Sequence, residues 1–205
     1  MTLKNRFIQI CFNFTQNQIL IDDLWYEIEK KYSEKGRYYH NKEHLENMFC
    51  ELELVKDKIQ NFKNITFSVF YHDVIYDATS KLNEEKSAEF AKIKLEKLGL
   101  NTNDIAEISK QILATKSHKK SENDDINYLL DADLSVLGKD PETYLEYTKN
   151  IRREYSIYPD FLYKPGRKKV LQHFLELDSI FKTEDFIERY EIQAKENISM
   201  ELNDL

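Results

Sequence analysis

The sequence predicts an all-α fold, a helical bundle of about eight or nine helices that forms one domain over residues 1–205. Two observations lead to this prediction. Only four Gly and three Pro interrupt the 205 residues, so long uninterrupted elements are expected. Apolar side chains recur at three-and-four spacing along most of the chain, which is the period of an amphipathic helix, and no convincing alternating strand is present.

The first helix is expected over roughly residues 3–31, with a break near Asn17 and an end at Gly36. Its apolar face consists of Phe7, Ile10, Cys11, Phe14, Leu20, Leu24, Trp25 and Ile28. Asn41 has the residue type and the place of an N-cap, and one apolar face follows it as far as Ile59. A second helix is therefore expected after Asn41.

The segment FSVFYHDVIYD, residues 67–77, is apolar nearly all round and predicts a buried central helix. The next stretch, NEEKSAEFAKIKLEKLG, has Asn83 as a cap, acids in its first turn and Gly99 at its end. Further helices are expected near residues 102–115, 123–137, 141–155, 166–178 and 183–202. The polar run KSHKKSENDD predicts a loop between two of them.

Bulk composition excludes several classes of protein. A net charge of −7 argues against a nucleic-acid binder or a partner of anionic membranes. No run of about 18 apolar residues exists, so no membrane span is expected. The start of the chain lacks a signal-peptide cleavage pattern. Cys11 and Cys50 make no disulfide framework. The expectation is a reduced, cytoplasmic enzyme or binding module.

Histidine is scarce, yet ligand-type residues gather where core helices are expected. Two of the five histidines, His40 and His44, lie one helical turn apart, and His72 is followed directly by Asp73. A carboxylate within the apolar run VFYHDVIY costs several kcal/mol unless it has a partner, and a divalent cation would be one such partner. A histidine pair on a solvated face, and a core histidine bonded to its neighbouring aspartate, are the structural alternatives.

The order of these motifs resembles the HD superfamily of metal-dependent phosphohydrolases. YHNKEH and ADLS are similar to motifs of cyclic-nucleotide phosphodiesterases. RYYHNKEH, FYHDVIYD, NEEKSA and DADLSVLG, followed by IRREY and YKPGRKKVL, resemble the family of small bacterial predicted metal-dependent HD phosphohydrolases. The resemblance covers roughly residues 25–200, and it is specific in motifs and order but says little about the substrate.

The resemblance implies a role for each matching residue. It makes His44, His72, Asp73 and Asp133 the metal ligands and His40 the general acid that protonates the leaving oxygen. Asp73 would bridge two ions if two are bound. Mg²⁺, Mn²⁺, Fe²⁺, Co²⁺, Ni²⁺ and Zn²⁺ all suit two His and two Asp. Asp131 lies about 200° around a helix from Asp133, and is left to orient a ligand histidine or to cap a neighbouring turn.

Other acids and His118 each have two alternative roles. Glu84 or Asp77 could orient the attacking water, as acids after the HD pair do in related enzymes. Glu84 and Glu85 also have the place of helix-start acids that complement the macrodipole. His118 either contacts substrate phosphate or a second ion, or is a loop histidine in a solvated charge run. His173 is expected on the surface.

A basic cluster stands out in this acidic chain: Lys164, Arg167, Lys168 and Lys169. If PGRKK begins a helix, its charges oppose the helix dipole, which an anionic ligand would explain. Arg167, with Arg152 or Arg153, is therefore expected to bind substrate phosphate. A solvated basic face is the alternative.

Together these features predict a metal-dependent phosphohydrolase that acts on a small phosphate ester, with a nucleotide as the expected substrate. A non-catalytic nucleotide sensor is the alternative from another class. A diiron oxygenase of HD type is a weaker alternative, because that branch uses additional histidines. The expected partner is a small phosphorylated molecule, and the chain is expected to be a monomer or a homodimer.

Overall fold

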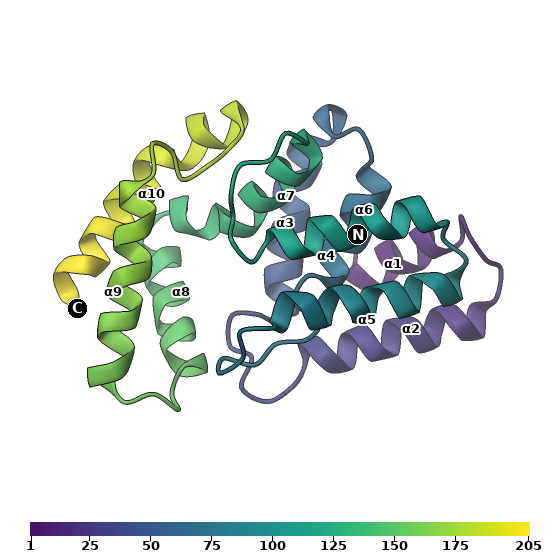
Figure 1. Ribbon diagram of the computed structural model, residues 1–205, viewed down its shortest axis with the longest axis horizontal. Helices are drawn as coiled ribbons and strands as arrows, with labels where there is room; N and C mark the ends of the chain where they lie inside the picture. The colour runs from purple at the N-terminus through teal and green to yellow at the C-terminus, as the bar shows by residue number, and fades with distance from the viewer.

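The computed structural model describes residues 1–205 and contains ten α-helices, two 3₁₀-helices and no strand (Figure 1). The all-α prediction is confirmed, with slightly more helices than the eight or nine expected. The helices are α1 (Leu3–Cys11), α2 (Gln18–Tyr32), α3 (Lys42–Leu54), α4 (Phe62–Tyr71), α5 (Asn83–Leu98), α6 (Thr102–Ala114), α7 (Asp124–Leu134), α8 (Pro141–Glu154), α9 (Asp160–Glu176) and α10 (Glu184–Asp204). The 3₁₀-helices are η1 (Lys56–Lys58) and η2 (Ser135–Gly138).

Local signals in the sequence begin and end these helices. Asn17 caps α2 by accepting from the N–H of Leu20 at 3.1 Å, so the expected break at Asn17 separates two helices. Asn41 likewise accepts from the N–H groups of Glu43 and His44 at the start of α3. Gly99 ends α5 at φ +91°, a left-handed conformation that favours glycine.

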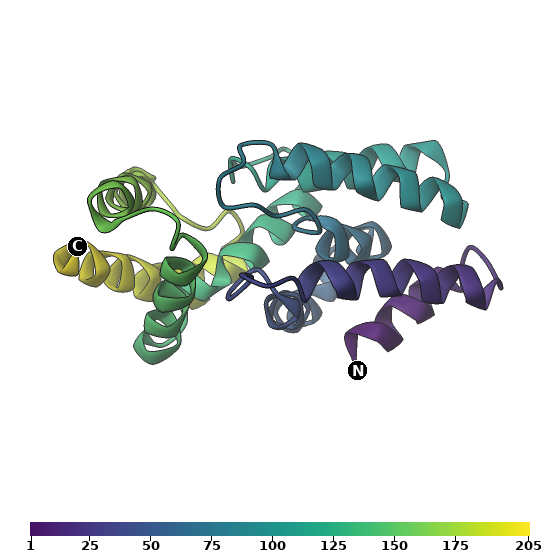
Figure 2. The same ribbon diagram turned by 90° about the horizontal axis from the view of Figure 1, so that it is seen from below.

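The helices form two regions, which we call the helical body (α1–α7) and the C-terminal layer (η2 and α8–α10). In the body, α4 is central, packs on α6 and contacts α3, α5 and α7. Figure 2 shows α1 and α2 on the opposite side of the body from α5 and α6. In the C-terminal layer, α10 packs on η2 and α9 (Figure 1).

Helix α9 differs from the expected 166–178. It begins at Asp160 and contains Pro165, so the PGRKK segment lies in the middle of the helix. The basic residues therefore do not oppose the dipole of a helix N-terminus, and the argument for an anionic ligand at a helix start does not hold. Only Leu171 of this helix is buried, so the periodic apolar signal that would have fixed its beginning is absent.

Candidate metal centre

Three side chains from three helices of the body converge on one point. His44 lies in the first turn of α3, His72 is the C-cap residue of α4, and Asp133 lies near the end of α7. One ligand atom from each side chain lies within 4.8 Å of the other two. We call these residues the ligand cluster. Both histidines are buried and the aspartate is partly buried.

The hydrogen bond of His72 to the backbone fixes which of its ring nitrogens faces the cluster. His72 Nδ1 lies 2.9 Å from the Val69 carbonyl, which can only accept, so this nitrogen carries a proton and Nε2 faces the cluster. His72 Nε2 lies 3.2 Å from His44 Nε2, and His44 Nε2 lies 3.1 Å from Asp133 Oδ1. Two imidazole nitrogens and a carboxylate oxygen at this spacing fit a divalent cation.

Burial and charge act in opposite directions on the two cluster histidines. Burial lowers the pKa of His44 and thereby favours the neutral imidazole that a metal requires. Burial would also lower the pKa of His72, but the carboxylates of Asp73 and Asp133 outweigh it and raise this pKa to about 9. In the metal-free chain the His72 imidazole is therefore protonated and supplies a positive charge next to these carboxylates. Metal binding at Nε2 would release this proton.

Asp73 lies at the edge of the ligand cluster. Helix α4 ends at Tyr71, so Asp73 follows the helix instead of continuing it. This end allows adjacent residues to converge: Asp73 Oδ2 lies 3.2 Å from His72 Nε2 and 3.9 Å from His40 Nε2. Its carboxylate is therefore placed between the cluster and His40.

His40 is held beside the cluster by a carboxylate that the sequence reasoning did not assign. Glu154, at the end of α8, accepts from His40 Nδ1 at 2.6 Å and from the Tyr76 hydroxyl at 2.8 Å through Oε2. Its Oε1 accepts three backbone N–H groups, those of Tyr38, Tyr39 and His40, at 2.8, 2.7 and 2.9 Å. One carboxylate thus fixes both the backbone and the ring of His40.

This pairing favours the protonated form of His40. Burial would lower the pKa of His40, but the hydrogen bond and charge of Glu154, with the charge of Asp73, outweigh it and raise the pKa. Burial would raise the pKa of Glu154, but His40 and the backbone N–H groups hold it at about 2. His40 can therefore hold a proton at Nε2, on the side that faces Asp73.

His118 lies at the same site. Its backbone is left-handed, with φ +49°, and its Nε2 lies 2.9 Å from Asp133 Oδ2. The loop histidine therefore contacts the second oxygen of the cluster carboxylate. Asp131 points elsewhere, because it accepts the backbone N–H groups of Lys182 and Thr183 and the Thr183 hydroxyl at the start of α10.

The structure does not bring the expected phosphate-binding arginines to the cluster. Arg167 donates from Nε and Nη2 to the Glu201 carboxylate at 2.7 and 2.9 Å. The rings of Tyr147 and Tyr39 separate it from His44. Arg152 also has a carboxylate partner on the C-terminal layer: its Nη2 lies 2.8 Å from Asp160 Oδ1.

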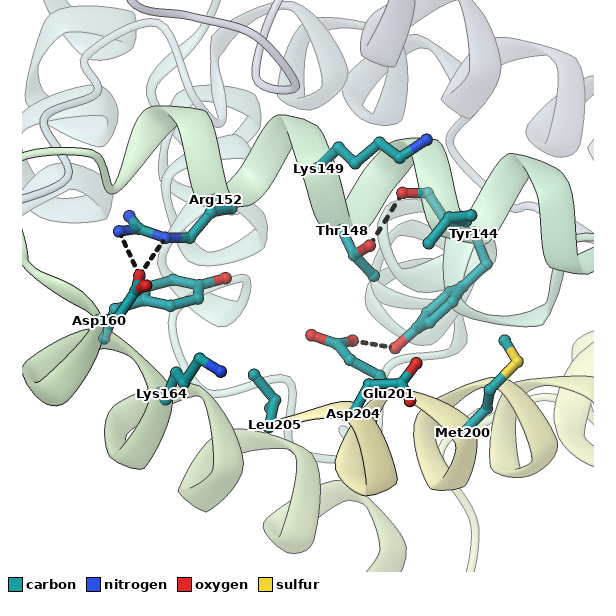
Figure 3. A pocket seen from close by; sticks show the side chains of 12 residues that line it. Tyr144, Thr148, Lys149, Arg152, Asp160, Lys164, Met200, Glu201, Asp204 and Leu205 are labelled. Carbon is teal, nitrogen blue, oxygen red and sulfur yellow. Dashed lines mark hydrogen bonds and ion pairs between the residues drawn. The ribbon is translucent and has the colours of Figure 1, made fainter.

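Arg152 lines a cavity of about 400 Å³ among α8, α9 and α10, which has no residue of the ligand cluster in its wall. Figure 3 shows Arg152 reaching Asp160 on one side of this cavity and Tyr144 donating to Glu201 on the other. A second cavity, of about 650 Å³, lies between the start of α3 and α8, and His44 is among its lining residues.

The acids after the HD pair have structural surroundings. Glu84 lies half-buried in the first turn of α5 and makes no hydrogen bond or ion pair. Its neighbour Glu85 pairs with Lys116. Asp77 accepts from the backbone N–H and hydroxyl of Thr79, at 2.8 Å each. None of the three contacts the ligand cluster.

Comparison with protein-family models, with curated proteins and with solved structures finds no match for this chain. None of its helices is long and apolar enough to cross a bilayer. The site must therefore be interpreted from its own geometry.

Proposed function

We propose that the protein is a metal-dependent phosphohydrolase that acts on a small phosphate ester, with nucleotides as the substrate class. The observation that carries this proposal is the position of the proton-holding His40 beside the convergent nitrogens and oxygen of His44, His72 and Asp133. A hydrolase of this type needs a cation site and a proton donor within reach of one ester. The resemblance of the motifs to HD phosphohydrolases supports the same interpretation.

Each side chain has a distinct task in this proposal. His44, His72 and Asp133 would hold a divalent ion, with Asp73 beside them. When bound, the ion would supply a Lewis acid and a source of nucleophilic water. His40 holds a proton at Nε2 and donates it to the leaving oxygen, while Glu154 keeps Nδ1–H occupied and the ring oriented. His118 steadies the outer oxygen of Asp133.

The cavity that reaches His44 supports a small substrate. Its volume of about 650 Å³ lies within the range of small-molecule sites. Tyrosine rings and asparagine amides line it, among them Tyr39, Tyr147, Asn41 and Asn150. Such groups suit the polar, planar part of a nucleotide better than they suit its phosphate.

The test combines metal content with turnover. Purified full-length protein would be stripped with chelator, reloaded with Mn²⁺ and assayed for phosphate or nucleoside release on cyclic, mono- and polyphosphate nucleotides. We expect His44→Ala to lose metal and turnover together. His40→Ala should keep the metal and lose turnover by about 10²- to 10⁴-fold. His173→Ala is the matched control, because His173 is exposed on α9.

Two results would contradict the proposal. Nucleotide binding without turnover in metal-loaded wild type would indicate a sensor instead of an enzyme. Equal metal loss in His40→Ala and His44→Ala would make His40 a ligand and remove the proton donor from the scheme.

A further inference from the structure

Arg37 is a buried charge without a carboxylate in hydrogen-bonding contact. It lies in the segment between α2 and α3, and only 3% of its side chain is exposed. The Glu34 carboxylate is 3.7 Å from Nη2 and is itself largely exposed. A buried guanidinium is costly unless its N–H groups are satisfied. Its Nε has no hydrogen-bond partner, so the residues that accept from Nη1 and Nη2 indicate why it is there.

Those residues are the two segments that carry the proposed chemistry. Nη1 donates to the backbone carbonyls of Asp73 and His40 at 2.6 and 3.2 Å. Nη2 donates to the Val74 carbonyl at 3.0 Å. The rings of Tyr32 and Tyr76 flank the guanidinium, with centroids 5.1 and 5.5 Å away. The carbonyls after α4 lie at a helix C-terminus, where a cation is favourable.

The guanidinium thereby joins two segments that α3 and α4 separate in the chain. His40 belongs to the irregular segment before α3, whereas His72 and Asp73 end α4. The planar donors of one arginine fix carbonyls from both segments in one geometry. Glu154 fixes His40 from the side of α8, and Arg37 fixes it relative to Asp73, across the 3.9 Å between His40 Nε2 and Asp73 Oδ2.

We propose that Arg37 is a positioning residue, which sets the placement of the proton donor His40 relative to the metal-ligand pair His72 and Asp73. This inference rests on the proposed function for its effect on turnover. The placement itself can be measured in the metal-free protein. Arg37 contacts neither substrate nor ion in this scheme and acts only through the two backbone segments.

The first test measures the placement of His40 without any assay of activity. The His40 ring stacks on Tyr76 with centroids 4.2 Å apart, so its ring-proton NMR resonances depend on that geometry. Arg37→Gln should shift these resonances in the metal-free protein, and Arg37→Lys should shift them less. Arg6→Gln is the control, because Arg6 of α1 is a partly buried arginine that pairs with Glu53 and lies over the Phe49 ring of α3. It should leave them unchanged.

The second test measures turnover on the substrate found in the nucleotide panel. Arg37→Gln should lower kcat by about 10²-fold, the effect of misplacing a catalytic group by about 1 Å. KM should not change, because no substrate contact is removed. Arg37→Lys should restore part of kcat, and Arg6→Gln should retain all of it. If Arg37→Gln does not fold, the test rests on Arg37→Lys, for which we expect a partial loss of kcat.

Unchanged His40 resonances together with unchanged kcat in a folded Arg37 variant would overturn the inference. A change in KM alone would overturn it too, since that result would make Arg37 a substrate-binding residue. Wild-type protein that binds metal but turns over no nucleotide would contradict the proposed function, and the His40 resonances would still decide the role of Arg37.

Discussion

The helical body and the C-terminal layer share one apolar core but differ in the contacts that supplement it. In the body, aromatic rings pack around Phe70, with centroids of Phe49, Phe7 and Trp25 at 5.0, 5.2 and 6.2 Å. In the C-terminal layer, Phe186 and Ile198 of α10 extend this core, but α9 buries only Leu171, and paired charges add further connections. Glu51 of α3 binds Lys139, Arg189 and Tyr190, and Arg167 binds Glu201.

The two kinds of contact contribute differently to the stability of the fold and to the alignment of its helices. Apolar packing is non-directional and supplies most of the free energy of folding. Hydrogen-bonded charge pairs add little net stability but fix one arrangement of the elements that carry them. The ligand cluster belongs entirely to the body, whereas the carboxylate that fixes His40 comes from α8. The layer thus contributes alignment to a site whose ligands lie elsewhere.

The largest expected effects are losses of unfolding free energy, and they distinguish apolar packing from the paired charges. Phe70→Ala should cost about 3–5 kcal/mol of unfolding free energy, because it leaves a cavity in the body. Glu201→Leu should cost a similar 3–5 kcal/mol, because it leaves the buried Arg167 unpaired. Adding Arg167→Met should recover most of the second loss, since an apolar pair replaces the ion pair. Urea denaturation measures all three variants.

The comparison fails if the double variant is no more stable than Glu201→Leu. That outcome would mean that the layer depends on the charge pair for stability and not only for alignment.

Acid should loosen the contact between the layer and the His40 segment. The pKa of Glu154 is about 2 in the folded chain against an ordinary value of 4.5. A depressed carboxyl pKa contributes stability that is full above about pH 4.5 and is lost as the pH falls towards 2. The difference corresponds to roughly 3 kcal/mol. Denaturation of metal-free wild type and Glu154→Gln between pH 6 and 2 measures it.

The wild type should lose more of its stability than Glu154→Gln over this range. Parallel curves for the two proteins would show that Glu154 is not held in its charged form by His40 and the backbone N–H groups.

The smallest expected effect concerns turnover. Glu154→Gln keeps the shape of the side chain but removes the charge that favours protonated His40, so turnover should fall about 10- to 100-fold with metal content unchanged. Glu51→Gln is the control, since Glu51 is also a buried carboxylate that joins the two regions. It should lower stability and leave turnover per folded molecule unchanged. Equal loss of turnover in both variants would remove the special role of Glu154.

The body was largely predictable from the sequence because its signals are local. Apolar spacing identified the helices, and Asn17, Asn41 and Gly99 marked their ends. In the C-terminal layer the prediction was wrong for α9, whose beginning lies six residues before the expected one, at Asp160. Its exposed faces carry no apolar period, and the PGRKK segment, which was expected to begin the helix, lies inside it.

The site was predictable where the residue type itself signals chemistry. Histidines and aspartates in apolar surroundings marked candidate ligands, and the resemblance to HD phosphohydrolases selected His44, His72 and Asp133 among them. Glu154 was missed, although Tyr144, Ile151 and Glu154 form the buried face of α8 and place a carboxylate on an inward stripe. Arg37 left no such signal, because its partners are backbone carbonyls, which every residue has. The clustering of arginines in the sequence drew attention to Arg152 and Arg167 instead.

The single carboxylate that fixes His40 also has a place in the order of synthesis. All three residues of the ligand cluster precede Glu154 in the chain, and Glu154 is the last residue of α8. A growing chain emerges from its N-terminus onwards. The cation site can therefore be complete on a nascent chain whose proton donor has not yet received its anchor. Under the proposed function, the residues that would hold the ion are thus made before the carboxylate that would anchor the proton donor, and η2 and α8 are made in between.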